Sequence, residues 1–563
     1  MAKQMKIHKS TLVLLIFTTL SSFSVAQQVD LANVSKIGKS KPVAFSGGLS
    51  AGSVMYGGNP QPGRQEWTYY LNGSLNVNIF GQINIPVNVN LTNLGANIAY
   101  PSLPNRLSLH PTYKWVTAHM GDASMTFSPY TLNGHQFTGA GVELAPGKWK
   151  ISAMGGRLLR KVVYSGVNPS VMPNYERFGY GLKTEYTAAK YDLGVSIFTG
   201  KDKEDEIARL VNDSLGIQPM QNMALSLSAK LNTVKNMSFI VEYGISFLNR
   251  NLYNSGSENR NTYHAVNARL NYQFMKNTVG IGYERIDPDY KTLGAYYFNN
   301  DYENITLNYS RPFLKGDKAN IALSFGVQRD DLDHKKEEAT NRYVASAGLN
   351  YTPSEKIQTS FNYSTFQSYR NLKSQFDYIN ETSPYQNLDT LNYSQLSQNM
   401  EASVLYNFRQ SDKQSQRLNL TASYQESADR QGGIATPGNV SRFANSGLGY
   451  SISFIPQSIS VNASFNLSYS YASSMESYTY GPMLGITANL LKKTLTTGFS
   501  TSYNVNMNGA VTQAKVLNLR TNAGYALKKK HNLRANFVWQ NKDISGKAKK
   551  DITTTTISYS YSF

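Results

Sequence analysis

The chain has 563 residues and no cysteine, and its 55 Lys and Arg against 36 Asp and Glu give a formal charge of +19. The lack of cysteine excludes disulfides, thiolate metal sites and a lipoprotein anchor. Charged residues make up only 16% of the sequence, while tyrosine occurs 39 times. After the N-terminal region there is no run of about 18 apolar residues, which excludes helical membrane spans.

The first 26 residues have the pattern of a secretory signal peptide. Lys3, Lys6 and Lys9 precede a short apolar run from Thr11 to Leu20, and small residues lead up to Ala26. The apolar run is too short to span a bilayer comfortably, so cleavage is favoured over an N-terminal anchor. Loss of the three lysines changes the charge from +19 to +16.

Residues 27–41 are predicted to be a short polar periplasmic leader, and residues 42–563 to be one domain. The leader is much too short for the globular plug of a TonB-dependent receptor. Alternating segments begin at once, the first being Pro42 to Tyr56, Trp67 to Phe80 and Gln82 to Thr92. We therefore expect a single domain that consists of strands.

The C-terminal strand shows the repeating pattern most clearly. Ile557, Tyr559, Tyr561 and the terminal Phe563 alternate with serines. One face would meet lipid and the other a wet lumen, as in outer-membrane β-barrels. The aromatic terminus, with Tyr559, Tyr561 and Phe563, resembles the signal that the barrel-assembly machinery reads in this class.

The same period of two recurs along most of the chain, which a helix cannot generate. Short turns, such as 146–148 and 275–277, alternate with long polar loops. The predicted long loops are 200–221, 251–261, 287–302, 330–341, 368–390, 427–441, 472–481 and 541–551. We expect short periplasmic turns, long extracellular loops and a small helix over Glu204 to Leu215.

The predicted fold class is all-β, a single transmembrane antiparallel up-and-down barrel of about 26 strands, with 24 as the alternative. The count is least secure between Leu94 and Ser128. Both chain ends are expected on the periplasmic side.

Few residues point to catalysis or metal binding. His119, Asp122 and Ser124 are close in sequence, but proximity is poor evidence for a catalytic set. The acidic run from Asp330 to Glu338 lacks the spacing of a calcium loop, so a solvated loop is favoured. We expect no enzymatic activity, no cofactor, no metal site and no nucleic-acid partner.

Four arginines are predicted to point inward by the alternation of their strands: Arg269, Arg417, Arg520 and Arg534. A pore lined by guanidinium, Asn and Ser would favour anionic or sugar-like solutes, because fixed charge lowers their entry barrier. The alternative is that these arginines pair with carboxylates and brace the wall.

A glycine-rich segment from Tyr113 to Lys161 differs from the rest and contains two of the four tryptophans. Glycine within strands marks bends or close backbone approach, so Asp122 to Gly134 is predicted to fold inward and narrow the pore. This segment resembles one found in large, functionally unassigned outer-membrane barrels of the Bacteroidetes type. The resemblance covers about fifty residues and implies no catalytic or ligand residues.

Together these features predict an integral protein of the Gram-negative outer membrane, with a pore or transporter for polar or anionic small solutes as the favoured function. The alternative is a structural or assembly component of a protein-export or surface-assembly complex. The expected partners are outer-membrane lipid and lipopolysaccharide, the barrel-assembly machinery and, for the alternative, envelope proteins.

Overall fold

The computed structural model describes residues 42–563, apart from 59–65, 94–105, 163–172, 205–215, 233, 254–259, 297, 315, 336–340, 366–367, 372–392, 397, 428–429, 432–433, 436–439, 473–474 and 529. The predicted signal peptide, the leader and most of the loop helix predicted at 204–215 lie outside these residues. No helix within the described ranges has the length and apolar character needed to cross a bilayer.

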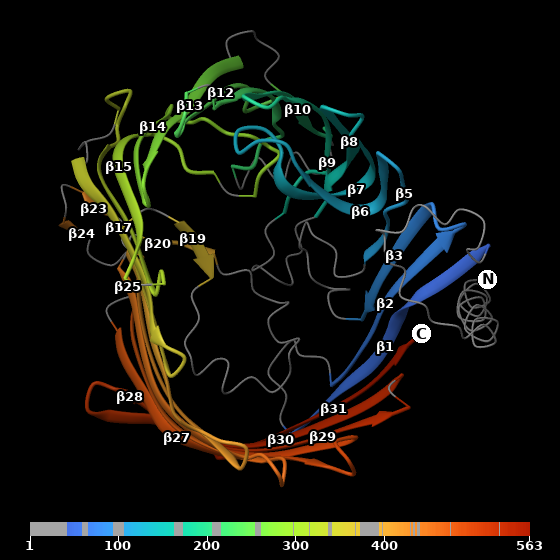
Figure 1. The fold of residues 1–563 in the computed structure, drawn as a ribbon, viewed down its shortest axis with the longest axis vertical. Helices are drawn as coiled ribbons and strands as arrows, with labels where there is room; N and C mark the ends of the chain where they lie inside the picture. The colour runs from blue at the N-terminus through green and yellow to red at the C-terminus, as the bar shows by residue number, and fades with distance from the viewer. Residues whose placement is uncertain are drawn as a thin grey trace.

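One antiparallel sheet closes on itself into a barrel (Figure 1). Each strand pairs with its neighbours along the chain, and β1 (Val43–Gly58) pairs with β31 (Lys550–Ser562) to close the ring. The short β4 (Arg106–Leu109) and β5 (Thr112–Tyr113) both lie between β3 (Ile83–Thr92) and β6 (Val116–Thr126), so they share one strand position. The barrel therefore has 26 strand positions, which confirms the larger of the two predicted counts.

The remaining strands follow in chain order around the ring. In the first half these are β2 (Trp67–Ile79), β7 (Asn133–Leu144), β8 (Trp149–Leu159), β9 (Arg177–Thr187), β10 (Tyr191–Asp202), β11 (Gln221–Leu231), β12 (Met237–Asn249), β13 (Arg260–Phe274), β14 (Asn277–Ile286) and β15 (Tyr302–Phe313). In the second half they are β16 (Ala319–Arg329), β17 (Asn341–Ser354), β18 (Ile357–Ser364), β21 (Gln398–Gln410), β22 (Gln414–Ser427), β25 (Ser441–Phe454), β26 (Ile459–Ala472), β27 (Met475–Leu490), β28 (Leu495–Asn508), β29 (Val511–Leu527) and β30 (His531–Ile544).

Two small hairpins stand apart from the barrel sheet. One pairs β19 (Ser368–Asn371) with β20 (Tyr393–Leu396), and the other pairs β23 (Arg430–Gln431) with β24 (Ile434–Ala435). The second hairpin lies within the predicted long loop 427–441, whereas in the first only β19 lies within the predicted loop 368–390 and β20 follows it.

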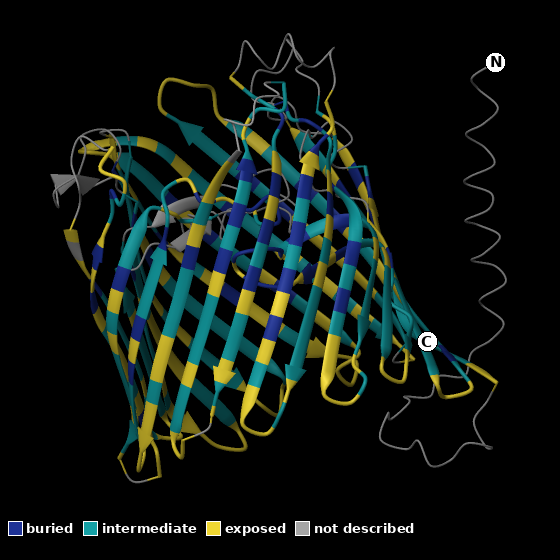
Figure 2. Cartoon of the chain, turned by 90° about the horizontal axis from the view of Figure 1, so that it is seen from above, coloured by how far each residue is buried: buried dark blue, intermediate teal, exposed yellow. Residues whose placement is uncertain are grey.

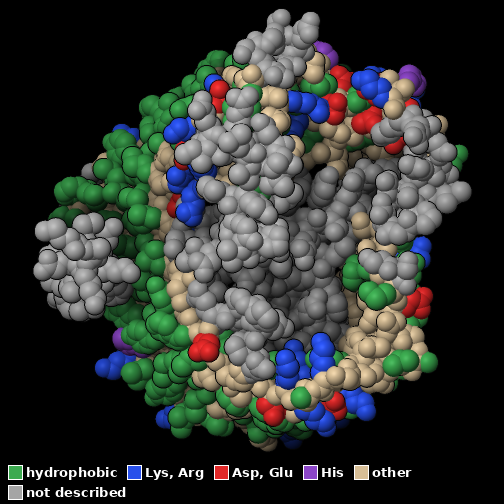
Figure 3. Space-filling view, turned by 180° about the vertical axis from the view of Figure 1, so that it is seen from behind, with side chains coloured by type: hydrophobic (Ala, Val, Ile, Leu, Met, Phe, Trp, Pro, Cys, Tyr) green, Lys and Arg blue, Asp and Glu red, His purple; other side chains and the backbone are tan. Residues whose placement is uncertain are grey.

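The two faces of the wall differ as the alternation predicts. On β10 the odd-numbered Leu193 and Val195 are 46% and 44% exposed, while the even-numbered Ser196 is buried. The same contrast appears on β28, where Phe499 is 46% exposed and Ser502 is buried. Hydrophobic side chains cover much of the outer wall in Figure 3. An apolar exterior over a polar interior is the arrangement of a barrel that meets lipid.

The connections separate into two ends (Figure 2). Short turns such as 275–276 and 455–458 lie at the end that holds the C-terminus, which we call the turn end. Longer connections lie at the opposite end, which we call the loop end; among the described residues they include 216–220 and 287–296.

Two predicted long loops are wrong. In the first, residues 475–481 belong to β27. In the second, β30 ends at Ile544 and β31 begins at Lys550, so only five residues connect the two strands. The polar residues of these segments predict loops, but in the structure they continue the ladders of their neighbouring strands.

The last residue is part of the closing seam. The Phe563 amide donates to the Gly47 carbonyl at 3.0 Å, and the Gly47 amide donates to the Phe563 carbonyl at 3.2 Å. The Phe563 ring stacks on Tyr561, with centroids 5.7 Å apart. The C-terminus therefore completes the β1–β31 ladder.

Deletion of Phe563 is expected to impair assembly, because it removes a hydrogen-bond pair of the seam and the terminal ring. The measurement is the fraction of protein that shows heat-modifiable migration on gels, with Phe563→Tyr as the matched control. Full assembly of the deletion variant would contradict this role of the terminus.

Candidate functional site

Among the described residues, the main departure from a plain barrel is a pair of loops at the loop end, residues 127–132 and 287–301 without 297. The first connects β6 to β7 and the second connects β14 to β15. Phe127, Tyr130 and Leu132 are 5%, 3% and 0% exposed, and Tyr290 and Leu293 are 0% and 1% exposed. Loop residues this deeply buried must pack against other parts of the protein rather than extend into solvent.

The loops bind the inner face of the wall. Ser128 donates to the Glu242 carboxylate, which also accepts from Ser226 at 2.7 Å. The Thr131 hydroxyl lies 3.1 Å from that of Ser196. On β10, β11 and β12 these wall residues alternate with exposed apolar residues of the outer surface, so they face the barrel interior. The first loop therefore lies inside the barrel.

The second loop is fixed to the wall in the same region. Its Lys291 carbonyl accepts from Ser246 at 2.7 Å, and its Leu293 amide donates to Asn222 Oδ1 at 3.2 Å. Asn222 is itself fully buried and donates to Ser246 at 2.7 Å. The polar interior of β11 and β12 thus satisfies the backbone of the loop, as buried peptide groups require.

The two loops also bind each other. Tyr290 donates its hydroxyl to the Tyr130 carbonyl at 2.9 Å, and Thr292 donates to the Thr131 carbonyl at 2.5 Å. The Asn133 amide donates to the Gly294 carbonyl at 2.8 Å. Burial raises the pKa of Tyr290, so its hydroxyl stays protonated and remains a donor. We call residues 127–132 and 287–301 the loop pair.

An apolar cluster lies beneath the loop pair. It joins the first loop and Leu293 to the inner face of the wall and contains Ala123, Met125, Phe127, Leu132, Phe137, Met154, Leu158, Phe198 and Leu293. A second cluster combines Tyr130 and Tyr290 with Ala265 and Ile286. These clusters form a small hydrophobic core within a barrel interior that is mostly polar.

Glycines in the wall provide room for the loop pair. A Cβ at Gly244 would lie 2.7 Å from the Tyr130 Cβ and 2.9 Å from the Tyr290 hydroxyl. A Cβ at Gly181 would lie 2.6 Å from the Phe127 ring. Both distances are too short for a real side chain, so these strand positions need glycine for close approach.

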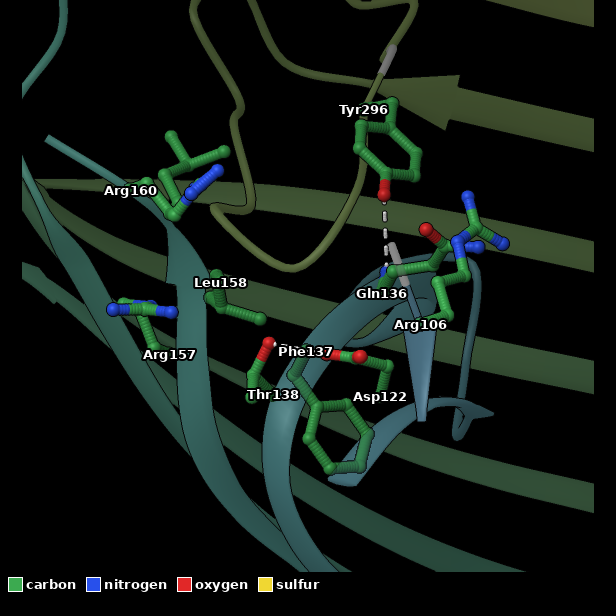
Figure 4. Close-up of a pocket in the computed structure, with 10 residues that line it drawn as sticks. Arg106, Asp122, Gln136, Phe137, Thr138, Arg157, Leu158, Arg160 and Tyr296 are labelled. Atoms are coloured by element: carbon green, nitrogen blue, oxygen red, sulfur yellow. Dashed lines mark hydrogen bonds between the residues drawn. The ribbon is translucent and has the colours of Figure 1, made fainter. Parts of the chain in front are cut away.

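A narrow crevice adjoins the loop pair at its outer edge (Figure 4). Tyr296 stacks on His135 with centroids 4.1 Å apart, and its hydroxyl accepts from the Gln136 amide at 3.2 Å. Asp122 accepts from Thr138 at 2.6 Å and from the Leu107 amide at 3.0 Å. The cavity volume is about 20 Å³, which is room for a water molecule.

The inward fold of the first loop confirms the prediction for residues 127–132. The prediction is wrong for 122–126, which belong to β6, and for 133–134, which belong to β7. The sequence pattern predicts an external loop at 287–302, so the inward course of this segment is a finding of the structure. Its signal was the dense apolar and aromatic content from Tyr290 to Phe298, which is unusual for a solvated loop.

The suggested catalytic set does not assemble. His119 Nδ1 lies 2.8 Å from His110 Nδ1, and its Nε2 lies 3.8 Å from Glu143. Asp122 and Ser124 lie on the opposite face of β6 and pair with Thr138 and Gln136 of β7. Among the residues that the structure describes, no group of three or more His, Asp or Glu side chains is placed to hold a metal ion.

The predicted lumen arginines lie in two regions. Arg417 and Arg520 belong to one continuous row of paired residues: Arg417, Ser451, Asn462, Gly485, Ser500 and Arg520. Directly paired residues share one face of a sheet. Arg534 pairs with Gly524, and the Arg417 Nε donates to Asn407 Oδ1 at 2.9 Å.

Arg269 lies apart on β13, opposite Ile240 and Gly282. The adjacent strands carry Glu242 and Glu284, and Glu284 accepts from Asn267 at 3.0 Å. Acidic groups near β13 were not anticipated from the sequence. The loop pair does not bring the four arginines into one site.

No family model matches the chain, and a comparison with characterised proteins gives no match. Among solved structures, the chain is similar to the usher in an Escherichia coli P pilus tip assembly intermediate (PapC-PapD-PapK-PapG), with a TM-score of 0.44, 14% identity, and coverage of 94% of this chain and 62% of that chain. This chain thus spans less than two thirds of that usher.

The P pilus usher translocation pore gives a TM-score of 0.41 at 11% identity, over 92% of this chain and 99% of that chain. The siderophore receptor PirA from Pseudomonas aeruginosa gives 0.40 at 10% identity, over 92% and 80%. These likenesses concern large outer-membrane β-barrels and extend only to architecture.

Substitution of Gly244 by Val is expected to displace Tyr130 and Tyr290 and to release the loop pair, at a cost of about 1–3 kcal/mol for overpacking. Amide hydrogen exchange of residues 127–132 should become faster. The matched control is Gly449→Val, where the nearest atom to a new Cβ is 3.9 Å away. Equal protection in both variants would contradict the packing described here.

Proposed function

We propose that the chain is an integral outer-membrane barrel that passes small polar or anionic solutes, with the loop pair as its constriction. The observation that carries the proposal is an apolar exterior around a polar interior in which two loops are bound to one side of the wall. Polar side chains can form hydrogen bonds with water in a lumen, whereas in lipid a polar group without a hydrogen-bond partner raises the free energy of the folded protein. A fixed constriction would set the size of what passes.

Charge supports the anionic preference. Without residues 1–26 the chain carries +16, and basic side chains are visible around the rim in Figure 3. Arg417 and Arg520 share a face with Ser and Asn positions, and Arg534 lies on the same face of β30 as Gln540. Positive groups along a lumen lower the entry barrier for anions.

The cellular context remains part of the proposal. Residues 1–26 would be cleaved as a signal peptide, residues 27–41 would form a periplasmic leader, and the turn end would face the periplasm. Lipid, lipopolysaccharide and the barrel-assembly machinery would be its partners. The glycine-rich segment at 113–161 supports a place among the large barrels of the Bacteroidetes type. The barrel would have no enzymatic activity.

Purified wild-type protein is expected to give discrete conductance steps in planar bilayers, with selectivity for anions. The double variant Arg520→Ala and Arg534→Ala should show weaker anion selectivity, because two positive charges leave the inner face. The matched control is Lys276→Ala, whose ammonium binds Asp317 at the turn end.

A second function is a structural or assembly role in protein export, which a barrel of 26 strands would accommodate. Absence of conductance together with stoichiometric co-purification of envelope proteins would reject the solute pore and favour that alternative.

A further inference from the structure

A larger cavity lies between the loop pair and the loop end of β12. Its volume is about 630 Å³, and its lining includes Met220, Arg250, Tyr290, Lys291, Phe298 and Asn300. Cavities of several hundred Å³ are typical of small-molecule sites. We call it the mouth cavity.

Among the described residues that line the mouth cavity, the cations Arg250 and Lys291 outnumber the single carboxylate, Asp289. Asp289 binds Arg250 at 2.7 Å. Outside the lining, Asp202 binds Arg177 through two contacts of 2.7 and 3.0 Å. Within the described part of the chain, Lys291 forms no ion pair, and its ammonium has only the Met220 sulfur at 3.9 Å. A thioether is a weak acceptor and carries no charge.

The surroundings of Lys291 favour an added anion. The Lys291 side chain is exposed at the cavity. Partial desolvation, followed by the charges of Arg177 and Arg250, lowers the pKa of Lys291, while Asp202 acts in the opposite direction. A negative group beside the ammonium would relieve this repulsion and favour the charged form. The cavity is therefore suited to one more anionic group.

Aromatic rings line the mouth cavity together with Lys291. Tyr290 and Phe298 stack with centroids 5.0 Å apart and an interplanar angle of 26°. Asn300 donates Nδ2 to the Tyr290 carbonyl at 3.0 Å, which leaves its Oδ1 as an acceptor. A cation, a ring surface and an amide acceptor match a sugar ring that carries an acidic group.

We propose that the mouth cavity binds an acidic sugar, with its carboxylate or phosphate on Lys291 and its ring against Phe298. This inference deepens the proposed function, since it names a solute class and the place of its capture, and its part in transport rests on that function. The mouth cavity lies at the loop end, where a solute would meet the loop pair before the rest of the lumen.

The test is isothermal titration of the full-length barrel in detergent with glucuronate, glucose 6-phosphate and glucose. We expect both anions to bind. Glucose should bind at least about tenfold more weakly than the anions, because it lacks the charged hydrogen bond to Lys291. Affinity for the anions should fall with rising ionic strength. Equal binding of glucose and the anions, or no binding of any of the three, would overturn the proposal.

Variants of Lys291 test whether this residue binds the anionic group of the sugar. Lys291→Met should weaken anion binding at least about tenfold, whereas Lys291→Arg should retain part of it. The matched control is Lys201→Met on the outer face of β10, where Lys201 pairs with Glu204 at 3.5 Å. Each variant is first checked for heat-modifiable migration, so a folding defect is recognised. Wild-type affinity in Lys291→Met would overturn the assignment.

Binding and conductance separate the two proposals. Titration needs no open pore, so a barrel that binds glucuronate but never conducts would reject solute passage and keep the site. A barrel that conducts anions without measurable binding would reject the site alone.

Discussion

The backbone hydrogen-bond ladder is the constraint on which the rest of the structure depends. A strand in lipid has no water to satisfy an open edge, and each unpaired group costs several kcal/mol. The seam between β1 and β31 removes the last edge, and it extends to the terminal Phe563. Once the ring is closed, alternation along each strand assigns apolar side chains to the exterior and small polar ones to the interior.

The interior of the barrel is subject to a second constraint. A ring of 26 strands is wide, and the side chains of its polar wall do not fill the space inside it. The loop pair covers part of this space on the side of β10 to β14. Its backbone hydrogen-bonds to Asn222 and Ser246, its Thr131 hydroxyl lies beside that of Ser196, and glycine at 244 lets it approach closely. Wall and loops are thus complementary, and the mouth cavity is what remains between them.

The fold was largely predictable, because a period of two is a local property that any stretch of sequence displays. Segments such as Ile459 to Tyr471 and the C-terminal strand needed no long-range information. The direction of a loop is different, since it depends on residues far away in the chain. Nothing near Tyr290 in the sequence indicates that Tyr130 and Gly244 will surround it. Polar stretches such as 475–481 were misread because a polar lumen makes strands resemble loops.

The most direct test of the loop pair as a fixed part of the wall is a crosslink between Thr131 and Ser196, whose hydroxyl oxygens lie 3.1 Å apart. The chain has no cysteine, so Thr131→Cys with Ser196→Cys introduces a single pair. We predict nearly complete disulfide formation in the assembled barrel, and none when Thr131→Cys is combined with Ser502→Cys on distant β28. Two freely reactive thiols at 131 and 196 in an assembled barrel would contradict the account.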